Sequence, residues 1–341
     1  MNSNRDFSRA DAWGKNQFNS AFPAALCCYL ANKNIKANYL VSHDSKVYCD
    51  VIDIQEVFGI ETTSSDIYFA FESQYTPFQP LVIGSLPRVD LVIQNKTNGN
   101  CIAGFEIKLT ALPDNTTCDR QESEYGSELV VRPDTIVYLA CSIAYKHKSS
   151  ELLSNSFTSL VVNDWSDSHE VLQHFPQISK AIQELVSRLS MGEQKPFLIQ
   201  PIWKTKGKSP VLSEHCLDVF IWSDIAFANF IADIACKEQT THINRQQRTI
   251  IWLYKMLHDY MRYGRFDHKT IIDQLSYNTK NDKAFAVSGN ITNRYMRCDR
   301  LLKPAITKSE IKNIILGGGQ NLLSPERRFD AIVFSSPELF A

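Results

Sequence analysis

The sequence lacks a CxxC pair among its nine cysteines, and it lacks any uninterrupted apolar run as long as a membrane span. Most of the cysteines stand in apolar runs such as AALCCYLA, so we expect buried, reduced thiols rather than a zinc site. The N-terminal MNSNRDFSRADAWGKN has no apolar core of the kind a signal peptide needs. We therefore expect a cytoplasmic protein with no membrane partner.

Other familiar signatures are also missing. The eight histidines show no spacing typical of metal ligands, and no internal repeat or low-complexity linker is present. The triplet Gly317-Gly318-Gly319 is not followed by Lys-Ser or Lys-Thr, so we interpret it as the end of a helix rather than a phosphate-binding loop. What remains is a chain of 341 residues, 44% of them hydrophobic, which is enough for one large core or two smaller ones.

The net charge is close to zero, but the charged residues are unevenly distributed along the sequence. The formal net charge is −1, whereas residues 242–312 alone carry 14 basic against 6 acidic residues. Residues 201–341 as a whole carry 20 basic against 14 acidic residues. A nearly neutral protein can therefore present one basic face to nucleic acid, although a solvated helix surface has the same composition.

Hydrophobic periodicity predicts an α/β protein of the mixed α+β kind. In the first half we expect a helix from Phe18 to Leu30 and strands at 66–74, 135–142 and 156–164. In the second half we expect helices that begin at Pro176, span 215–236 and 309–319, and span 248–264 with Gly264 as the cap, followed by a strand at 329–335. We assign 1–200 to a core and 201–341 to a helical basic region, and the two can form one domain.

The most informative stretch is LPRVDLVIQNKTNGNCIAGFEIKL, which reads as two strands joined at the turn signal Asn98-Gly99. Asp90 stands in the first strand, while Glu106 and Lys108 share one face of the second. A two-residue turn pairs Asp90 with Ile107 and turns it away from Glu106. An odd loop or a bulge pairs Asp90 with Glu106 instead. A shared site therefore requires an irregular hairpin.

Two carboxylates that converge beside an ammonium group suit a hard divalent cation such as Mg²⁺, with the main-chain carbonyl of Ile107 as a further ligand. Lys108 could then orient a water molecule and stabilise negative charge, which points to phosphodiester hydrolysis. An ordinary surface hairpin with a cross-strand ion pair is the alternative on spacing alone. Burial of the charges in apolar strands favours the metal site, and Glu72 on the preceding strand is a further candidate ligand.

The segment Pro87-Arg88-Val89-Asp90 with Glu106-Ile107-Lys108 resembles the PD-(D/E)XK signature of type II restriction endonucleases, although two residues separate the proline from the aspartate. Longer strings, ADAWGKNQFNSAFPAALCCYLA, GSLPRVDLVIQ, GFEIKLTALPDNTTC and ELVVRPDTIVYLA, are similar to the HindVP family. The resemblance implies a restriction-endonuclease-like core with a central mixed β-sheet flanked by helices. It also implies a homodimer that uses Mg²⁺ to cut both strands of a short palindromic DNA site, expected to be GRCGYC. Asp90 and Glu106 would be metal ligands, and Lys108 would orient the attacking water.

Contacts with DNA require further residues. Arg can pair with guanine, and Asn with adenine, although a phosphate contact is commoner for any single arginine. Thr110, just after the hairpin, could donate to a phosphate. The other candidates lie in the basic half: Arg245, Arg248, Arg265, Asn290, Asn293, Arg294, Arg297, Arg300, Arg327 and Arg328.

The leading hypothesis is a type II restriction endonuclease that leaves 5′-phosphate ends, with a cognate DNA methyltransferase as its genetic partner. A structure-specific nuclease of repair or recombination is the first alternative. A non-catalytic DNA-binding protein with purely structural hairpin charges is the second. Digestion of plasmid DNA distinguishes these hypotheses.

Overall fold

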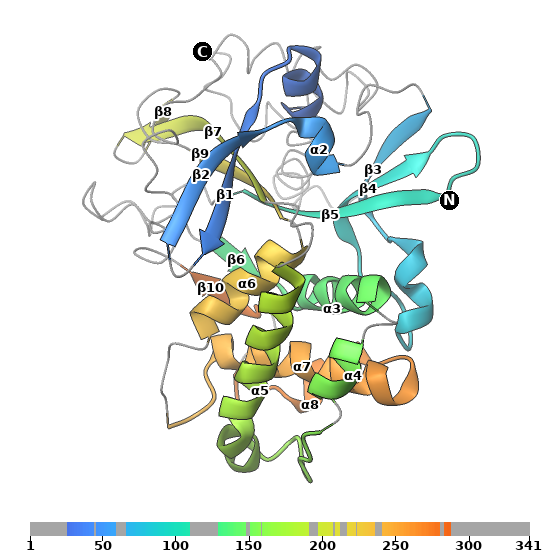
Figure 1. The fold of residues 1–341 in the computed structure, drawn as a ribbon, viewed down its shortest axis with the longest axis vertical. Coiled ribbons are helices and arrows are strands. Elements are labelled where there is room, and N and C mark those ends of the chain that lie inside the picture. Colours follow the sequence, from blue (N-terminus) through green and yellow to red (C-terminus); the bar gives the residue numbers. More distant parts are fainter. Residues whose placement is uncertain are drawn as a thin grey trace, which may run out of the picture.

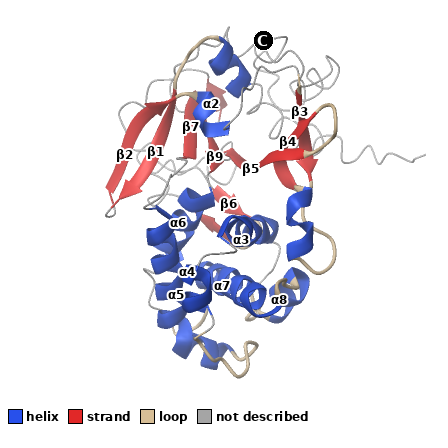
Figure 2. Ribbon diagram, turned by 45° about the vertical axis from the view of Figure 1, so that its right-hand side comes forward, coloured by secondary structure: helices blue, strands red, loops and turns tan. Residues whose placement is uncertain are grey.

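The strands gather at one end of the molecule and the larger helices at the other (Figure 1). Figure 2 shows the same division from a second direction. The computed structural model describes residues 26–43, 46–58, 66–109, 129–147, 151–157, 159–190, 197–206, 209–211, 217–222, 224–235, 241–279 and 283–287. The expected helix at 309–319 and the expected strand at 329–335 lie outside these residues. The first described residues, 26–32, are helical, in agreement with the end of the first expected helix.

The main sheet has eight strands in the order β2-β1-β7-β9-β5-β4-β3, with β8 added beside β7. Its members are β1 (Ala37–His43), β2 (Lys46–Ile52), β3 (Ile67–Ser73), β4 (Val89–Asn95), β5 (Cys101–Leu109), β7 (Phe197–Lys206), β8 (Ser209–Val211) and β9 (Leu217–Trp222). The expected strand at 66–74 and the expected hairpin are confirmed as β3 and as β4 with β5. Because β7 itself crosses residue 200, the two predicted regions share one sheet.

The strand directions differ from the expectation. Every strand pair in the described sheet is antiparallel, so the expected mixed sheet is wrong for this part of the chain. Parallel pairing is limited there to an isolated bridge between Val82 and Phe266. Antiparallel neighbours can be joined by short turns, as β4 and β5 are, and need no helical crossover. The helices are therefore free to gather at one end.

Helix α3 (Pro133–His147) replaces the strand expected at 135–142. All of its residues from Thr135 to Ala144 are buried, so the sequence shows a continuous apolar run instead of a one-sided stripe. A buried helix and a buried strand look alike in such a run. The helix does carry its own start signals, because Pro133 occupies its first position and Asp134 follows in the first turn.

Two further elements differ from the expected ones. The expected strand at 156–164 is wrong, because α4 (Glu151–Phe157) ends there and the following described residues are irregular. Helix α5 (Ser168–Ser190) confirms the predicted helix, but it starts eight residues before Pro176, which lies inside it. Its predicted stripe is buried against the core: Ile178, Ile182, Leu185, Val186 and Leu189.

The apolar run 215–236 is divided between two elements rather than forming one helix. Its first part is β9, which lies between β7 and β5, and its second part is α6 (Asp224–Ala235). The strand LDVFIW is rich in β-branched and aromatic residues, whereas DIAFANFIADIA is rich in alanine, which favours a helix. The composition changes between these two segments, and we overlooked this change within the single apolar run.

Helix α7 (Arg245–Tyr263) is confirmed within three residues of its expected start. Asn244 caps its first turn through a reciprocal pair of hydrogen bonds with Gln247. Trp252 and Tyr254 on α7 are buried, and the helix as a whole packs against α3, α5 and α6. The last turn ends at Gly264, which has a left-handed φ of 73° and donates its N–H to the carbonyl of Tyr260 at 2.7 Å.

Gly264 offers a test of this helix end. A side chain added there would meet no atom within 4 Å, so the cost of Gly264→Ala comes only from the left-handed backbone. We expect this variant to lower the free energy of unfolding by about 1 kcal/mol. Gly264→Asn should lose less, since Asn tolerates that conformation. Urea unfolding measures both, and an alanine variant as stable as wild type would contradict the assigned cap.

The remaining described elements connect the sheet to the helices. They are α2 (Ile54–Phe58), η2 (Thr76–Leu81), β6 (Leu129–Val131), α8 (His268–Gln274) and β10 (Phe285–Val287). β6 pairs with β10 immediately before α3 begins, which fixes the start of α3. The sheet is covered on both faces at β5: Phe105 packs on Phe58 of α2, while Gly104 packs under Tyr138 of α3. Among the described residues, no helix combines the length and the apolar character that crossing a bilayer requires.

Candidate active site

The β4–β5 hairpin has the irregular register that a shared acidic site requires. Leu91 pairs with Phe105 and Ile93 with Ala103, but the register shifts between Ile93 and Gln94. Continued past Leu91, the same register sets Asp90 opposite Glu106. Residues directly opposite in an antiparallel pair share a face. The bulge therefore brings the two acids to one side of the sheet, which confirms this condition on the hairpin.

Strand β5 changes its neighbour at the same point. Up to Phe105 it pairs with β4, and from Glu106 it pairs with β9. Beyond Phe105, a side chain of β4 contacts the backbone of β5. Asp90 Oδ2 accepts the N–H of Ile107 at 2.7 Å. In an extended strand the N–H and C=O of one residue point the same way. The carbonyl of Ile107 therefore also points towards Asp90.

Glu106 is buried, with 7% of its surface exposed. Its Oε1 accepts a hydrogen bond of 2.8 Å from the hydroxyl of Thr135, in the first turn of α3. Thr135 is itself 3% exposed. A charge so far from water needs compensation from hydrogen bonds, a helix N-terminus or a cation. The first two are present here, and the third is the expected metal.

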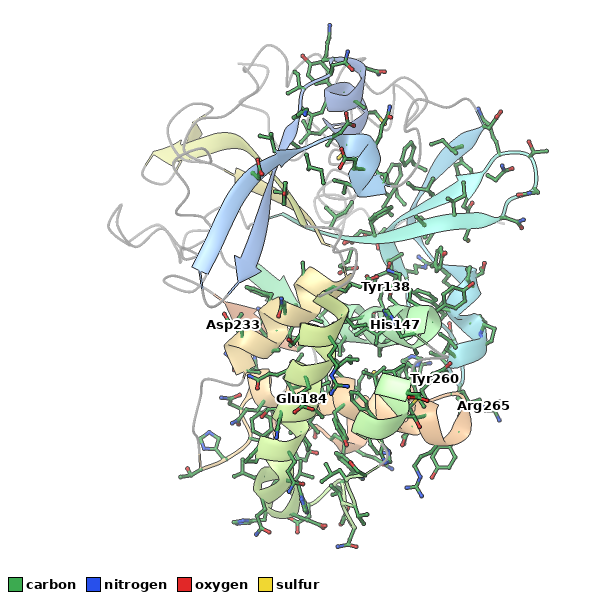
Figure 3. The ribbon with its side chains drawn as sticks, in the orientation of Figure 1. Tyr138, His147, Glu184, Asp233, Tyr260 and Arg265 are labelled. Carbon is green, nitrogen blue, oxygen red and sulfur yellow. The ribbon has the colours of Figure 1, made fainter. Side chains whose placement is uncertain are left out.

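Helix α3 also contacts β5 two residues earlier. The hydroxyl of Tyr138 donates to the carbonyl of Gly104. Burial raises the pKa of Tyr138 well above its usual value, and the acids Asp224 and Glu106 add to this. Tyr138 therefore stays protonated and can only donate to that carbonyl. Figure 3 labels Tyr138 on α3 where the helices meet the strands.

Gly104 permits this close approach. A Cβ at this position would lie 3.3 Å from the hydroxyl of Tyr138 and 3.3 Å from the ring of Tyr75. Tyr75 in turn donates its hydroxyl to the carbonyl of Ile102 at 3.3 Å. Two tyrosines thus hold the backbone of β5 just before Glu106.

A further acid, Asp224, lies close enough to Tyr138 and Tyr75 to raise the pKa of both. Its carboxylate accepts hydrogen bonds from the Ser142 hydroxyl and the Lys146 ammonium, both on α3. Asp224 was not predicted as a site residue, because we placed it inside one long helix. Thr135 and Tyr138 were missed because residues 135–142 were predicted to form a strand. Their i, i+3 spacing indicates a common helix face only once 135–142 is known to be helical.

Three predicted members of the site are placed less completely. Lys108 lies in β5 opposite Phe220 of β9, two positions after Glu106 in an unbroken register, while its side chain lies outside the described part of the structure. Thr110 is outside the described residues. Glu72 occupies the position of β3 that faces Asp90, since Phe71 pairs with Leu91 and Ser73 with Val89.

The backbone at Glu72 departs from a regular strand. Its φ is 48°, a left-handed value that costs a residue with a side chain about 1 kcal/mol or more. Glu72 is exposed, unlike Glu106. Positions 72, 90 and 106 thus form a row across three strands. Within the described residues, no three His, Cys, Asp or Glu side chains are grouped to hold a metal ion.

The residues present nevertheless fit Mg²⁺. This ion keeps several waters and takes one or two carboxylates from the protein, together with phosphate oxygens of the substrate. Asp90, Glu106 and the Ile107 carbonyl would supply oxygen ligands to such an ion, so a third acid would not be required. A cation would also compensate the cost of burying the Glu106 carboxylate.

Comparison with known proteins identifies the family. The model of the HindVP restriction endonuclease family matches residues 13–340. The chain belongs to the HindVP restriction endonuclease family. It is 52% identical over 340 residues to a probable type II restriction enzyme HindVP of Haemophilus influenzae, covering 99% of this chain and 92% of that protein. It is 43% identical over 342 residues to the type II restriction enzyme HgiDI of Herpetosiphon aurantiacus, covering 99% and 95%.

No solved structure matches this HindVP-family chain. The assignment of its sheet to a restriction-endonuclease-like core therefore stays a prediction, supported by the hairpin geometry alone. The family match covers both the sheet and the basic second half of the chain.

The structure places three of the predicted DNA contacts of this HindVP-family protein. Arg265 is exposed at the turn after α7, where Figure 3 labels it, and Arg245 is half-buried in the first turn of α7. Arg248 is wrong as a DNA contact, because it is 0% exposed. The others lie outside the described residues: Asn290, Asn293, Arg294, Arg297, Arg300, Arg327 and Arg328.

Arg248 instead makes hydrogen bonds inside the protein. Its guanidinium donates to the carbonyls of Lys283 at 2.7 Å and Ala284 at 3.2 Å, and to the hydroxyl of Thr279. The same group lies 4.4 Å from the ring centroid of Trp252, close enough for a cation–π contact. Arginine is suited to such a position because its planar fork can satisfy several acceptors at once.

Proposed function

We propose that this protein hydrolyses phosphodiester bonds in both strands of a short palindromic double-stranded DNA site, in a reaction that depends on Mg²⁺. The match to the HindVP restriction endonuclease family over residues 13–340 carries the proposal. Membership of this family makes the chain a type II restriction enzyme, which is a site-specific deoxyribonuclease. The register of the β4–β5 hairpin supports the position of the active site.

The roles of the residues follow from their chemistry. Asp90 and Glu106 would bind the cation through carboxylate oxygens, together with the carbonyl of Ile107. A bound Mg²⁺ supplies positive charge for the scissile phosphate and acidity for the attacking water. Lys108 would orient that water and stabilise the negative charge that develops on the phosphate. Glu72, across β4 from this group, is retained as a possible additional ligand.

The finer features of the proposal rest on the family resemblance. They are a homodimer, the sequence GRCGYC as the site, products with 5′-phosphate ends, a cytoplasmic location and a cognate DNA methyltransferase in the host. A dimer suits a palindrome because each subunit meets one strand in the same way. Thr110, Arg245, Arg265 and the basic segments from Asn290 to Arg328 are proposed to contact DNA.

Digestion of plasmid DNA tests this function. With Mg²⁺, a plasmid of known sequence should give discrete bands whose sizes match the spacing of GRCGYC sites, and with EDTA it should stay intact. Bands at other fixed positions would contradict the site but keep the class. Cleavage that follows DNA junctions or flaps would favour a repair nuclease. Absence of cleavage under any divalent ion would favour a non-catalytic DNA-binding protein.

A further inference from the structure

Thr135 makes a contact that the proposed reaction does not explain. Its hydroxyl donates to Glu106 Oε1 at 2.8 Å, although each residue belongs to a different element and 29 positions separate them in sequence. Both side chains are buried, with 3% of Thr135 and 7% of Glu106 exposed. A hydrogen bond between a hydroxyl and a carboxylate in such surroundings is strong and directional.

The start of α3 makes several further contacts. β6, which pairs with β10 over three residues, leads into the helix, and the Thr135 N–H donates to the Arg132 carbonyl at 3.2 Å. One turn later, the Tyr138 hydroxyl donates to the carbonyl of Gly104. Two successive turns of helix α3 therefore donate hydrogen bonds to β5, at Gly104 and Glu106.

Free rotation of the Glu106 carboxylate would weaken metal binding, since Mg²⁺ requires nearly octahedral ligand directions. A hydrogen bond to one carboxylate oxygen limits this rotation. We propose that Thr135 is a positioning residue, which sets the orientation of the Glu106 carboxylate for the divalent cation while Tyr138 fixes the strand beneath it. This inference rests on the proposed metal site at Asp90 and Glu106.

The experiment measures metal binding directly rather than cleavage. The full-length protein without DNA is titrated with Mn²⁺, and unbound Mn²⁺ is counted by electron paramagnetic resonance. We expect Thr135→Val, which removes the hydroxyl and keeps the volume, to raise the Kd for Mn²⁺ about tenfold. Thr135→Ser restores the hydroxyl and should bind within about threefold of wild type. If Thr135→Val does not fold, Thr135→Ala gives the same measurement.

Thr249→Val is the matched control. Thr249 is also fully buried, but its hydroxyl donates to the carbonyl of Arg245 on its own helix at 2.9 Å. The same chemical change there should leave the Kd for Mn²⁺ unaltered. A Thr135→Val protein that loses thermal stability yet keeps the wild-type Kd would overturn the inference, because the hydroxyl would then be purely structural.

Glu106→Gln separates this inference from the proposed function. If Glu106→Gln weakens Mn²⁺ binding and Thr135→Val does not, only the role of Thr135 is refuted. If Glu106→Gln binds Mn²⁺ as wild type does, the proposed metal site itself fails. A higher Kd in Thr135→Val, rescue in Thr135→Ser and no change in Thr249→Val is the pattern that supports the inference.

Discussion

Asp90→Asn and Glu106→Gln are each expected to slow DNA cleavage by about a thousandfold or more while DNA binding persists. Each substitution removes one carboxylate charge from the proposed metal site and keeps the shape of the side chain. Loss of a cation that stabilises the reacting phosphate costs several kcal/mol, and about 4 kcal/mol corresponds to a thousandfold. Lys108→Ala should cause a loss of similar size, because it removes the group proposed to orient the water.

The local structure should survive these substitutions. An Asn side chain at position 90 retains an oxygen that can accept the Ile107 amide, as the Asp90 carboxylate does at 2.7 Å. A Gln side chain at position 106 likewise retains an acceptor for Thr135. A loss of cleavage in folded protein would therefore report the missing charge and not a collapsed hairpin.

Single-turnover cleavage of a labelled duplex, together with binding of the same duplex in EDTA, measures the two effects separately. Asp66→Asn and Glu56→Gln are suitable controls, since both residues are exposed acids, Glu56 on α2 and Asp66 just before β3. These controls should cut DNA at the wild-type rate. Undiminished cleavage by Asp90→Asn would remove the hairpin from the mechanism, while equal losses in the controls would point to a general effect of charge.

The hairpin shows how far sequence alone could lead. The turn signal and the two apolar runs predicted β4 and β5, but not the register, because two registers were compatible with the residues. The observed shift lies between Ile93 and Gln94, away from Asn98-Gly99. A bulge at this place depends on which neighbours each strand acquires, and β5 acquires β9 from a distant part of the chain.

Helix α3 marks the opposite case. TIVYLACS is apolar throughout, and a fully buried segment has no polar face from which to read a period. Once this helix was interpreted as a strand, Thr135 and Tyr138 could not be placed against β5. Strand β7 was not predicted, and the β9 segment was assigned to a longer helix. The two strands at the centre of the sheet were therefore not predicted from the sequence.

The prediction that Arg248 contacts DNA was also wrong. Its observed position in the core leads to the second prediction of a large effect. Arg248→Met is expected to lower the free energy of unfolding by about 3 kcal/mol or more. Methionine fills a similar volume but leaves the part-buried carbonyl of Lys283 and the buried carbonyl of Ala284 without their present donor. It also removes the cation from the face of Trp252.

Arg245→Met is the matched control, because Arg245 lies on the same helix but is only half-buried. Its stability should stay within about 0.5 kcal/mol of wild type, as is usual for a surface substitution. If Arg245 contacts a phosphate, the Arg245→Met variant should bind DNA more weakly than wild type. Its DNA affinity should also depend less steeply on salt concentration. Urea unfolding followed by circular dichroism, and binding of duplex DNA at several salt concentrations, measure the two properties.

The two arginines should therefore respond in opposite ways. Arg248→Met should lose stability, and any loss of DNA binding should follow the fraction of unfolded protein. Arg245→Met should keep its stability and lose affinity. A Arg248→Met protein that unfolds like wild type but fails to bind DNA would return Arg248 to the DNA interface, and would mean that the buried guanidinium becomes exposed when DNA is bound.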